Sequence, residues 1–402
     1  MHHSSEKIST HHAHDEGRIF AWMALISSTG YSSFLTMLPI VLAEKLGSNV
    51  YVGYYFSVIA VVSLLISLGS TILLKKFSKV FLTKVILTSL CAIFIILTFA
   101  TNIYNFAIID ITRVTCVTLF FIILAIFVRD FAAEKEIALA EGRFYLFTNI
   151  GWVIGPITGG FIAKTFGTES AFIFAAFCYL VLAILFFHQN LKLKNPHLHM
   201  RTELEKPKTG LAEFWKNLKD FIRQKELRNA FLISFGMYFW WSISSIYMAL
   251  SLTQLGYSQQ IVGLVFALSV IPLILIEFHA TDGAKKYGVR NFLVIGYALL
   301  SIFLLLFTQA ESSTLIKLMI LVNIGSAFIE PNKEIFFFKQ VNKEDEERFY
   351  GIYNASYPIA YITAPAAGSI LLASFGMNGI WFGGAFVFIL MTFVALSIDK
   401  KY

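Results

Sequence analysis

The sequence predicts an all-α membrane protein with 12 transmembrane helices in two pseudo-symmetric six-helix bundles. Three observations lead to this fold class: the composition, a series of continuous apolar runs, and an internal repeat. Of 402 residues, 57% are hydrophobic and 14% are charged, whereas soluble domains are about 45–50% apolar and about 25% charged. Strands of a membrane β-barrel would alternate apolar and polar residues, so the continuous runs indicate helices.

Twelve apolar runs are long enough to cross a bilayer, which takes about 20 helical residues each. They fall at 19–43, 51–74, 81–100, 103–128, 144–166, 171–188, 229–253, 261–281, 291–308, 314–338, 349–374 and 379–398. We expect a disordered cytoplasmic tail over 1–17, an N-terminal bundle over 18–190, a cytoplasmic linker over 191–228 and a C-terminal bundle over 229–402.

The basic residues give the orientation. If the N-terminus is cytoplasmic, 27 of the 32 Lys and Arg fall on the inner side of the membrane, as membrane proteins prefer. Both termini are then cytoplasmic. The net charge of +7 reflects this topology and contact with anionic lipid, so we expect a lipid bilayer as partner and no nucleic acid.

The linker contains one amphipathic stretch. Its apolar residues fall on one helical face: Leu211, Phe214, Trp215, Leu218, Phe221 and Ile222. Its basic residues lie mostly off that face. We expect a helix on the inner membrane surface, with a partner-binding helix as the alternative.

The sequence offers little support for an enzyme or a metal site. The three cysteines lie in apolar runs and fit small core residues better than disulfides. No Gly-x-Ser-x-Gly or Walker A pattern is present. We expect no cofactor, no catalytic residue and no metal. Weak metal binding by the five histidines of the tail is the alternative there.

The two halves of the chain resemble each other. At an offset of 210, Gly53 matches Gly263, and the Lys75–Lys76 pair matches Lys285–Lys286. At an offset of 205, Arg143-Phe144-Tyr145 matches Arg348-Phe349-Tyr350. Further on, at an offset of 209, Gly155-Pro156 aligns with Ala364-Pro365. A collinear series at nearly constant offset indicates two parallel six-helix repeats.

Charged side chains inside apolar spans cost about 2.5–3.5 kcal/mol each and are functional candidates. We expect six of them to serve transport or proton coupling: Asp110, Arg113, Glu277, Glu330, Lys333 and Glu334. Either Glu330 or Asp110 would carry the proton, and Arg113 or Lys333 would hold an anionic group or act as counter-ion. The alternative is that these pairs are structural salt bridges, with Lys333 and Glu334 forming a cytoplasmic latch.

Spans 1 and 7 have polar and aromatic centres. We expect the substrate cavity to be lined by Tyr31, Tyr238, Trp240, Trp241 and Asn323. The rings could stack on an aromatic or cationic substrate. Ordinary packing within the membrane is the alternative for the tryptophans.

Span 5 carries Gly151-x3-Gly155-Pro156-x2-Gly159-Gly160. Glycines four residues apart share a helix face and allow another helix to approach closely. The pattern resembles the antiporter motif of the major facilitator superfamily (MFS). The resemblance covers residues 18–400 and implies the 12-helix fold, alternating access and a monomer. It also implies that spans 1, 4, 7 and 10 line a central cavity. Helix packing without directional meaning is the alternative for the motif.

Other motifs of that family are degraded. In the loop after span 2, Thr71 replaces the glycine and Lys75 replaces the acidic residue of the family pattern. In span 4, Arg113 matches an Arg-x3-Gly motif, but Val117 stands in place of the glycine. We expect a cytoplasmic gate that includes Lys75, Lys76, Arg143, Lys285, Lys286 and Arg348.

The favoured function is a proton-coupled exporter of a small organic molecule in a bacterial-type inner (plasma) membrane. The combination of the glycine motif with carboxylates in the membrane supports it. An uptake symporter or facilitator for an anionic metabolite is the first alternative. A non-transporting membrane receptor or scaffold is the second.

Overall fold

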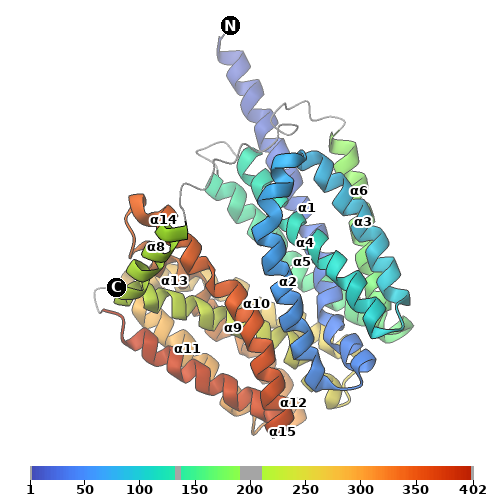
Figure 1. Ribbon diagram of the computed structural model, residues 1–402, viewed down its shortest axis with the longest axis vertical. Coiled ribbons are helices and arrows are strands. Elements are labelled where there is room, and N and C mark those ends of the chain that lie inside the picture. Colours follow the sequence, from blue (N-terminus) through green and yellow to red (C-terminus); the bar gives the residue numbers. More distant parts are fainter. Residues whose placement is uncertain (1, 132–136, 191–210, 400–402) are drawn as a thin grey trace. The chain divides into compact units, whose positions relative to one another are not determined.

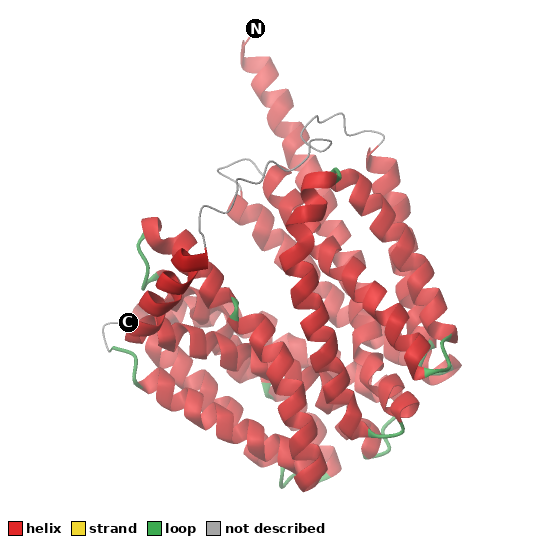
Figure 2. Ribbon diagram, in the orientation of Figure 1, coloured by secondary structure: helices red, strands yellow, loops and turns green. Residues whose placement is uncertain are grey.

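The computed structural model describes residues 2–131, 137–190 and 211–399, and each regular element in these ranges is a helix (Figures 1 and 2). The helices of the first half are α1 (His2–Leu46), α2 (Asn49–Lys76), α3 (Lys79–Phe99), α4 (Ile103–Phe131), α5 (Ile137–Phe166) and α6 (Ser170–Asn190). Those that follow are α8 (Leu211–Arg223), α9 (Lys225–Gln254), α10 (Gln259–Tyr287), α11 (Val289–Phe307), α12 (Ser312–Leu321), α13 (Asn323–Phe338), α14 (Lys343–Asn354) and α15 (Ser356–Leu396).

Within the described residues, ten helical segments are long and apolar enough to cross a membrane. The count differs from the expected 12 at two places. One is α9, whose many serines and aromatic residues with polar groups lower its hydropathy although it is 30 residues long. The other is the 49-residue segment Arg348–Leu396, which is longer than one bilayer crossing needs. Inside it, Gly376 has φ 69° and ψ −168°, a conformation that glycine adopts without a steric penalty. The helical path therefore breaks between the two expected spans.

The first helix also differs from the prediction. Residues 2–17, expected as a disordered tail, belong to α1, which begins at His2. Extending an existing helix costs far less free energy than nucleating a new one, so a long membrane span can continue into a polar segment.

The chain forms two compact units. The first contains Met1–Val41, Val62–Leu204 and Ser258–Ala267, and the second contains Leu42–Val61, Glu205–Tyr257 and Leu268–Tyr402. The beginning of α2 thus groups with the second unit, and the beginning of α10 groups with the first. A division of the sequence at the linker would therefore place the beginnings of α2 and α10 in the other unit.

The first unit is built around α3, which packs against α4 and α6. Its interior is aromatic. The ring centroid of Phe34 on α1 lies 5.0 Å from that of Phe94 on α3 and 4.7 Å from that of Phe172 on α6. Phe94 stacks in turn on Tyr179 at 5.3 Å. These rings join three helices in a packed core, and Phe34 also contacts Arg113 of α4.

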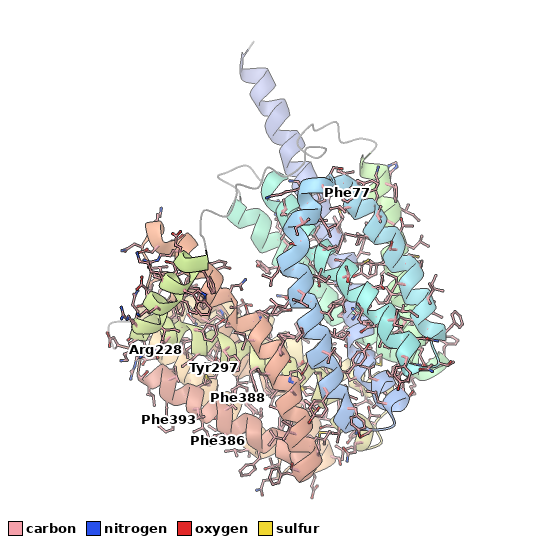
Figure 3. All side chains as sticks on the ribbon, viewed as in Figure 1. Phe77, Arg228, Tyr297, Phe386, Phe388 and Phe393 are labelled. Atoms are coloured by element: carbon pink, nitrogen blue, oxygen red, sulfur yellow. The ribbon has the colours of Figure 1, made fainter. Side chains whose placement is uncertain are left out.

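The second unit packs α15 against α9 and α11, and α13 against α9 and α11. Phe388 of α15 lies at the centre, with its ring centroid 6.1 Å from those of Tyr297 and Trp240. Phe386 and Phe393 of the same helix are exposed (Figure 3). The outward side of α15 is therefore apolar, as a helix that meets lipid requires.

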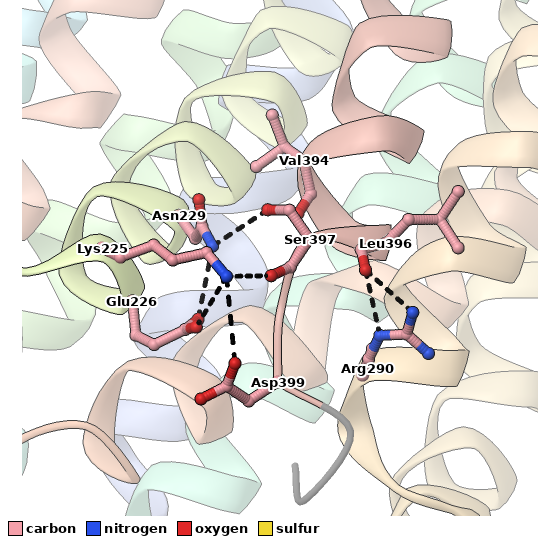
Figure 4. A network of polar contacts seen from close by, with 8 residues as sticks. All are labelled: Lys225, Glu226, Asn229, Arg290, Val394, Leu396, Ser397 and Asp399. Carbon is pink, nitrogen blue, oxygen red and sulfur yellow. Dashed lines mark hydrogen bonds and ion pairs between the residues drawn. The ribbon is translucent and has the colours of Figure 1, made fainter.

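The carboxyl end of α15 is held by cations from two other helices (Figure 4). Arg290, at the start of α11, donates to the carbonyl of Leu396 from Nη2 at 2.8 Å and from Nε at 3.3 Å. Lys225, at the start of α9, donates to the carbonyl of Ser397 at 2.5 Å. Such cations satisfy carbonyls that lack helical partners and complement the negative end of the helix dipole.

Candidate functional site

The six charged residues predicted inside spans form two groups, one in each unit. Asp110 and Arg113 lie on α4 in the first unit. The other four lie in the second unit, with Glu277 on α10 and with Glu330, Lys333 and Glu334 on α13. The two groups differ in how far they are enclosed, and this difference bears on what each can do.

The pair in the first unit is fully enclosed. Arg113 Nε donates to Asp110 Oδ1 at 2.6 Å, and the side chains are 3% and 0% exposed. The spacing of three residues brings the two onto one helix face. The guanidinium also lies over the ring of Phe34, 4.5 Å from its centroid, in cation–π geometry. Charge and ring together hold Arg113 in place.

The pair in the second unit is open on one side. Lys333 Nζ donates to Glu330 Oε1, and the side chain of Lys333 is 2% exposed whereas that of Glu330 is 27% exposed. The second carboxylate oxygen, Oε2, accepts a hydrogen bond from Trp241 Nε1 of α9 at 3.0 Å. A charged lysine thus lies inside and its carboxylate partner reaches the surface.

Local helix geometry accounts for this arrangement. Pro331 inside α13 lacks a backbone N–H and so weakens the helical hydrogen bonding at this turn. Asn332 Nδ2 donates to the carbonyl of Phe328 at 2.8 Å. Glu330 and Lys333, three residues apart, then lie on the same face of α13.

Two further carboxylates act on the same lysine. Glu277 and Glu334 each interact electrostatically with Lys333 and with Glu330. Both side chains are partly buried. Three carboxylates from two helices therefore interact with one ammonium group.

Aromatic rings lie next to the Glu330–Lys333 pair. The ring of Tyr238 on α9 lies over Lys333 Nζ, which is 4.9 Å from the ring centroid. The centroid of Tyr357 on α15 lies 5.1 Å from that of Tyr238, and Tyr361 follows at 4.7 Å from Tyr357. We call the connected set Trp241, Glu330, Lys333, Tyr238, Tyr357 and Tyr361 the α9–α13–α15 cluster.

Two of the predicted cavity residues are enclosed in the second unit. Trp240 is fully buried and donates from Nε1 to Asn323 Oδ1 at 2.9 Å. Asn323, also buried, donates from Nδ2 to the carbonyl of Ser269 on α10 at 3.0 Å. These bonds join α9, α10 and α13. Trp240 and Asn323 thus satisfy each other, while the neighbouring Trp241 faces Glu330.

The predicted cavity residue of the first unit, Tyr31 on α1, is half-buried. Its ring centroid lies 5.8 Å from that of Phe121 on α4 and 6.4 Å from that of Trp152 on α5. Both contacts are edge-on, which is a favourable arrangement for aromatic pairs.

The glycine face of α5 packs directly on α1. A Cβ atom at Gly151 would lie 2.7 Å from Ser28 Cβ, and one at Gly159 would lie 2.7 Å from Ser33 Cβ. A Cβ at Gly155 would lie 3.0 Å from the backbone nitrogen of Ser33. These distances are shorter than van der Waals contact, so glycine is required for the close approach of the two helices.

Two glycine contacts involve Pro156 and Gly160 of the α5 motif, and a similar contact involves Gly53. Within the first unit, a Cβ at Gly160 would lie 2.5 Å from the carbonyl oxygen of Gln259, and Gly263 lies against the carbonyl of Pro156. Within the second unit, Gly53 lies against the carbonyl of Pro365. Gly53 matches Gly263 in the sequence repeat.

Tyr247 of α9 adds a hydrogen bond where Gly53 meets Pro365. Its hydroxyl donates to the carbonyl of Pro365 at 2.8 Å.

The basic residues predicted for the gate have different surroundings. Lys75, Lys76, Lys285 and Lys286 are exposed, and Arg143 is partly buried. Lys285 pairs with Asp282 at 2.9 Å, and this ammonium group lowers the pKa of the Asp282 carboxyl through a hydrogen bond and its charge.

Arg348 at the end of the repeat has three partners. It donates from Nε to Asn217 Oδ1 at 2.7 Å and from Nη1 to Asp345 Oδ1 at 3.4 Å, and it pairs with Asp220 through Nη2. Asn217 and Asp220 belong to α8, so Arg348 ties the linker helix to α14.

The packing of α8 on α14 differs in part from the predicted amphipathic face. Phe221 is buried, with its ring centroid 5.9 Å from that of Phe349 on α14. Phe214, Trp215 and Ile222 are exposed. The apolar stripe of α8 is therefore divided, because one edge of it packs on the second unit and the rest stays open.

Sequence reasoning missed several residues of these groups. Tyr357 and Tyr361 lie four residues apart, a spacing that places them on one helix face, and this could have marked them. Asn217 and Asp220 had no such signal, because their partner Arg348 is 131 and 128 residues away in the chain.

Comparisons with solved structures agree with this fold. A mutant of the nucleoside transporter NupG has a TM-score of 0.77 at 12% identity, over 95% of this chain and 99% of that one. A POT family transporter in complex with 5-aminolevulinic acid has a TM-score of 0.76 at 13% identity, over 96% of each chain. A bacterial homologue of the iron transporter ferroportin, in an inward-facing state, has a TM-score of 0.74 at 11% identity, over 95% and 98%.

The sequence comparisons give the family. YqjV, an uncharacterised MFS-type transporter of Bacillus subtilis (strain 168), is 23% identical over 366 residues, which are 90% of this chain and 85% of that protein. The family model of the Major Facilitator Superfamily matches residues 20–276 and 230–401. The protein is therefore an integral membrane protein of transporter type, and the chain belongs to the major facilitator superfamily.

Proposed function

We propose that this protein is a proton-coupled exporter that moves a small organic solute by alternating access, and that Glu330 carries the proton. The observation that supports this most is the asymmetry of the Glu330–Lys333 pair. The carboxylate is 27% exposed and the ammonium is 2% exposed. A proton can therefore reach Glu330 directly, while its counter-ion stays in the protein.

Asp110 is less suited to this role. Its side chain is 0% exposed and accepts a hydrogen bond from the Arg113 guanidinium, which also lies over the ring of Phe34. Because arginine stays charged in proteins, a proton on Asp110 would weaken the ion pair of a buried cation. We therefore assign the Asp110–Arg113 pair a structural role.

The coupling step follows from the charges around Lys333. When Glu330 is ionised, it pairs with Lys333 and accepts a hydrogen bond from Trp241. When Glu330 takes up a proton, its attraction for Lys333 falls, and Lys333 retains its electrostatic interactions with Glu277 and Glu334. The two protonation states thus favour different positions of the lysine between α10 and α13, and this difference can bias a conformational equilibrium.

The proposal includes the finer topology. We propose 12 crossings, with α9 as one and α15 as two that meet at Gly376, and with both termini on the cytoplasmic side of a bacterial-type inner membrane. The placement of the basic residues supports this orientation. We also propose that the division at the linker separates two pseudo-symmetric bundles, that the protein works as a monomer, and that the glycine face of α5 serves export.

Uptake of an anionic metabolite is the function that competes with export. That reading needs an accessible cation in the membrane. Arg113 and Lys333 are 3% and 2% exposed, and each is paired with a carboxylate. The observed enclosure of both cations therefore favours a solute that is not an anion.

The test is proton flux in liposomes. Purified protein is reconstituted with a pH-sensitive dye inside, a proton gradient is imposed, and organic cations, sugars and organic anions are added in turn. We expect a solute-dependent pH change that Glu330→Gln abolishes. Asp282→Asn, which removes an exposed carboxylate at the end of α10, is the matched control and leaves the flux unchanged.

Two results contradict the proposal. One is an unchanged flux in folded Glu330→Gln protein, which removes Glu330 as proton carrier. The other is solute movement into the liposomes in the direction of the proton flow, which identifies a symporter.

A further inference from the structure

The α9–α13–α15 cluster presents its charges unequally to a ligand. Its carboxylate, Glu330, is partly exposed, whereas its ammonium group, Lys333, is covered by Glu330 and by the ring of Tyr238. A ligand that reaches this cluster meets a negative charge first. The ammonium is available to an anion only if the Glu330 contact breaks.

The charge balance of the surrounding helices points in the same direction. Residues 259–277 of α10 and the whole of α13 together carry three carboxylates and one lysine. The carboxylates interact with that lysine and with one another. An excess of negative charge in a membrane protein is costly unless protons or a bound cation offset it.

Aromatic rings extend from the exposed carboxylate across two helices. Trp241 is hydrogen-bonded to Glu330 through its indole N–H, so its ring is held beside the charge. Tyr238 and Tyr357 meet edge to face at 5.1 Å, and Tyr357 is 45% exposed. Ring faces next to a carboxylate are the features that recognise organic cations, through cation–π attraction and charge together.

We propose that the substrate is an organic cation with aromatic or bulky apolar groups, bound with its positive charge at Glu330 and its apolar part on Trp241, Tyr238 and Tyr357. This inference rests on the proposed function, because it names the solute class of the same site. The cation and the proton compete for Glu330, so binding of one favours release of the other. Lys333 stays the internal counter-ion and makes no contact with the substrate.

The test measures equilibrium binding without transport. Purified protein in mild detergent is titrated with radiolabelled tetraphenylphosphonium, a rigid aromatic monocation, and unlabelled benzyltrimethylammonium and benzoate are used as competitors. We expect saturable binding that the second cation displaces and benzoate does not. Glu330→Gln should weaken the affinity by about tenfold or more, which corresponds to about 1.4 kcal/mol.

A second pair of variants protects the test against poor folding of Glu330→Gln. Trp241→Leu removes a ring of the cluster, and we expect it to weaken tetraphenylphosphonium binding severalfold, with partial recovery in Trp241→Phe. Trp215→Leu removes an exposed indole on α8, a helix that contributes no residue to the cluster, and is the matched control that leaves binding unchanged.

Three outcomes overturn the inference: no saturable binding of either cation, unchanged binding in folded Glu330→Gln and Trp241→Leu, or displacement by benzoate. These outcomes differ from failure of the proposed function. Proton-coupled flux of some other solute, with no cation binding, would remove the cation and keep Glu330 as proton carrier. Cation binding at Glu330 without proton flux would keep the site and remove the coupling.

Discussion

The Asp110–Arg113 pair gives the sharpest prediction about structure as opposed to transport. Both side chains are almost completely enclosed, and the two charges are joined by a 2.6 Å hydrogen bond. Removing one partner leaves the other charge buried without this ion pair, which typically costs about 3–5 kcal/mol. We therefore expect Asp110→Asn and Arg113→Met each to lower the free energy of unfolding by an amount in this range.

Replacing both residues has a different expected result. Asp110→Leu combined with Arg113→Met removes both charges, and such replacements are often neutral or stabilising by about 1–4 kcal/mol. Loss of the cation–π contact between Arg113 and Phe34 offsets part of this gain, at about 0.5–2 kcal/mol. The double variant should therefore be close to the wild type and clearly more stable than either single variant.

Unfolding in mild detergent, followed by far-ultraviolet circular dichroism, checks this order. A difference of about 4 kcal/mol corresponds to about a thousandfold change in the folded-to-unfolded ratio, which is well within the range of the method. Proton-coupled flux of the double variant should persist. Single variants as stable as the wild type, or a double variant that folds but has lost all flux, would refute the structural assignment.

Three further predictions concern other parts of the chain. Gly155→Ala should destabilise the protein by about 1–3 kcal/mol through overpacking against α1. Gly142→Ala lies on the same helix with nothing within 4 Å of the new Cβ, so it should be neutral or stabilising. Thermal unfolding compares the two variants. Arg348→Ala should free α8, so that limited proteolysis cleaves residues 211–223 faster than in the wild type. An unchanged cleavage rate would show that Arg348 does not hold α8 in place. Because the Lys285 ammonium lowers the pKa of Asp282, Lys285→Ala should raise the pH at which Asp282 titrates in an NMR experiment. The Asp282–Lys285 contact is strongest above that pH and is lost as the pH falls through it.

The parts of the site that lie on one helix follow from local spacing. Asp110 with Arg113, and Glu330 with Lys333, are three residues apart, and each pair forms an ion pair in the structure. The apolar runs located the helices to within a few residues in most of the chain, as for 81–100, which is α3 (Lys79–Phe99). These features follow from periodicity and composition alone.

Features that depend on helix rotation and on distant partners could not be predicted. Trp240 and Trp241 are neighbours in the chain, yet Trp240 turns inward to Asn323 and Trp241 bonds to Glu330. Successive residues point about 100° apart around a helix, so only the packing of α9 against α13 decides which indole meets which partner. The burial of Phe221 against α14 likewise depends on a neighbour that the pattern does not contain.

The most direct measurement of the central claim is the protonation state of Glu330 itself. Infrared difference spectra are recorded on the reconstituted protein before and after addition of a transported solute. If Glu330 exchanges its proton for the solute, the band of a protonated carboxyl group disappears on addition, and this change is missing in Glu330→Gln and present in Asp282→Asn. A carboxyl band that does not respond to the solute, or one that responds equally in Glu330→Gln, would contradict the account.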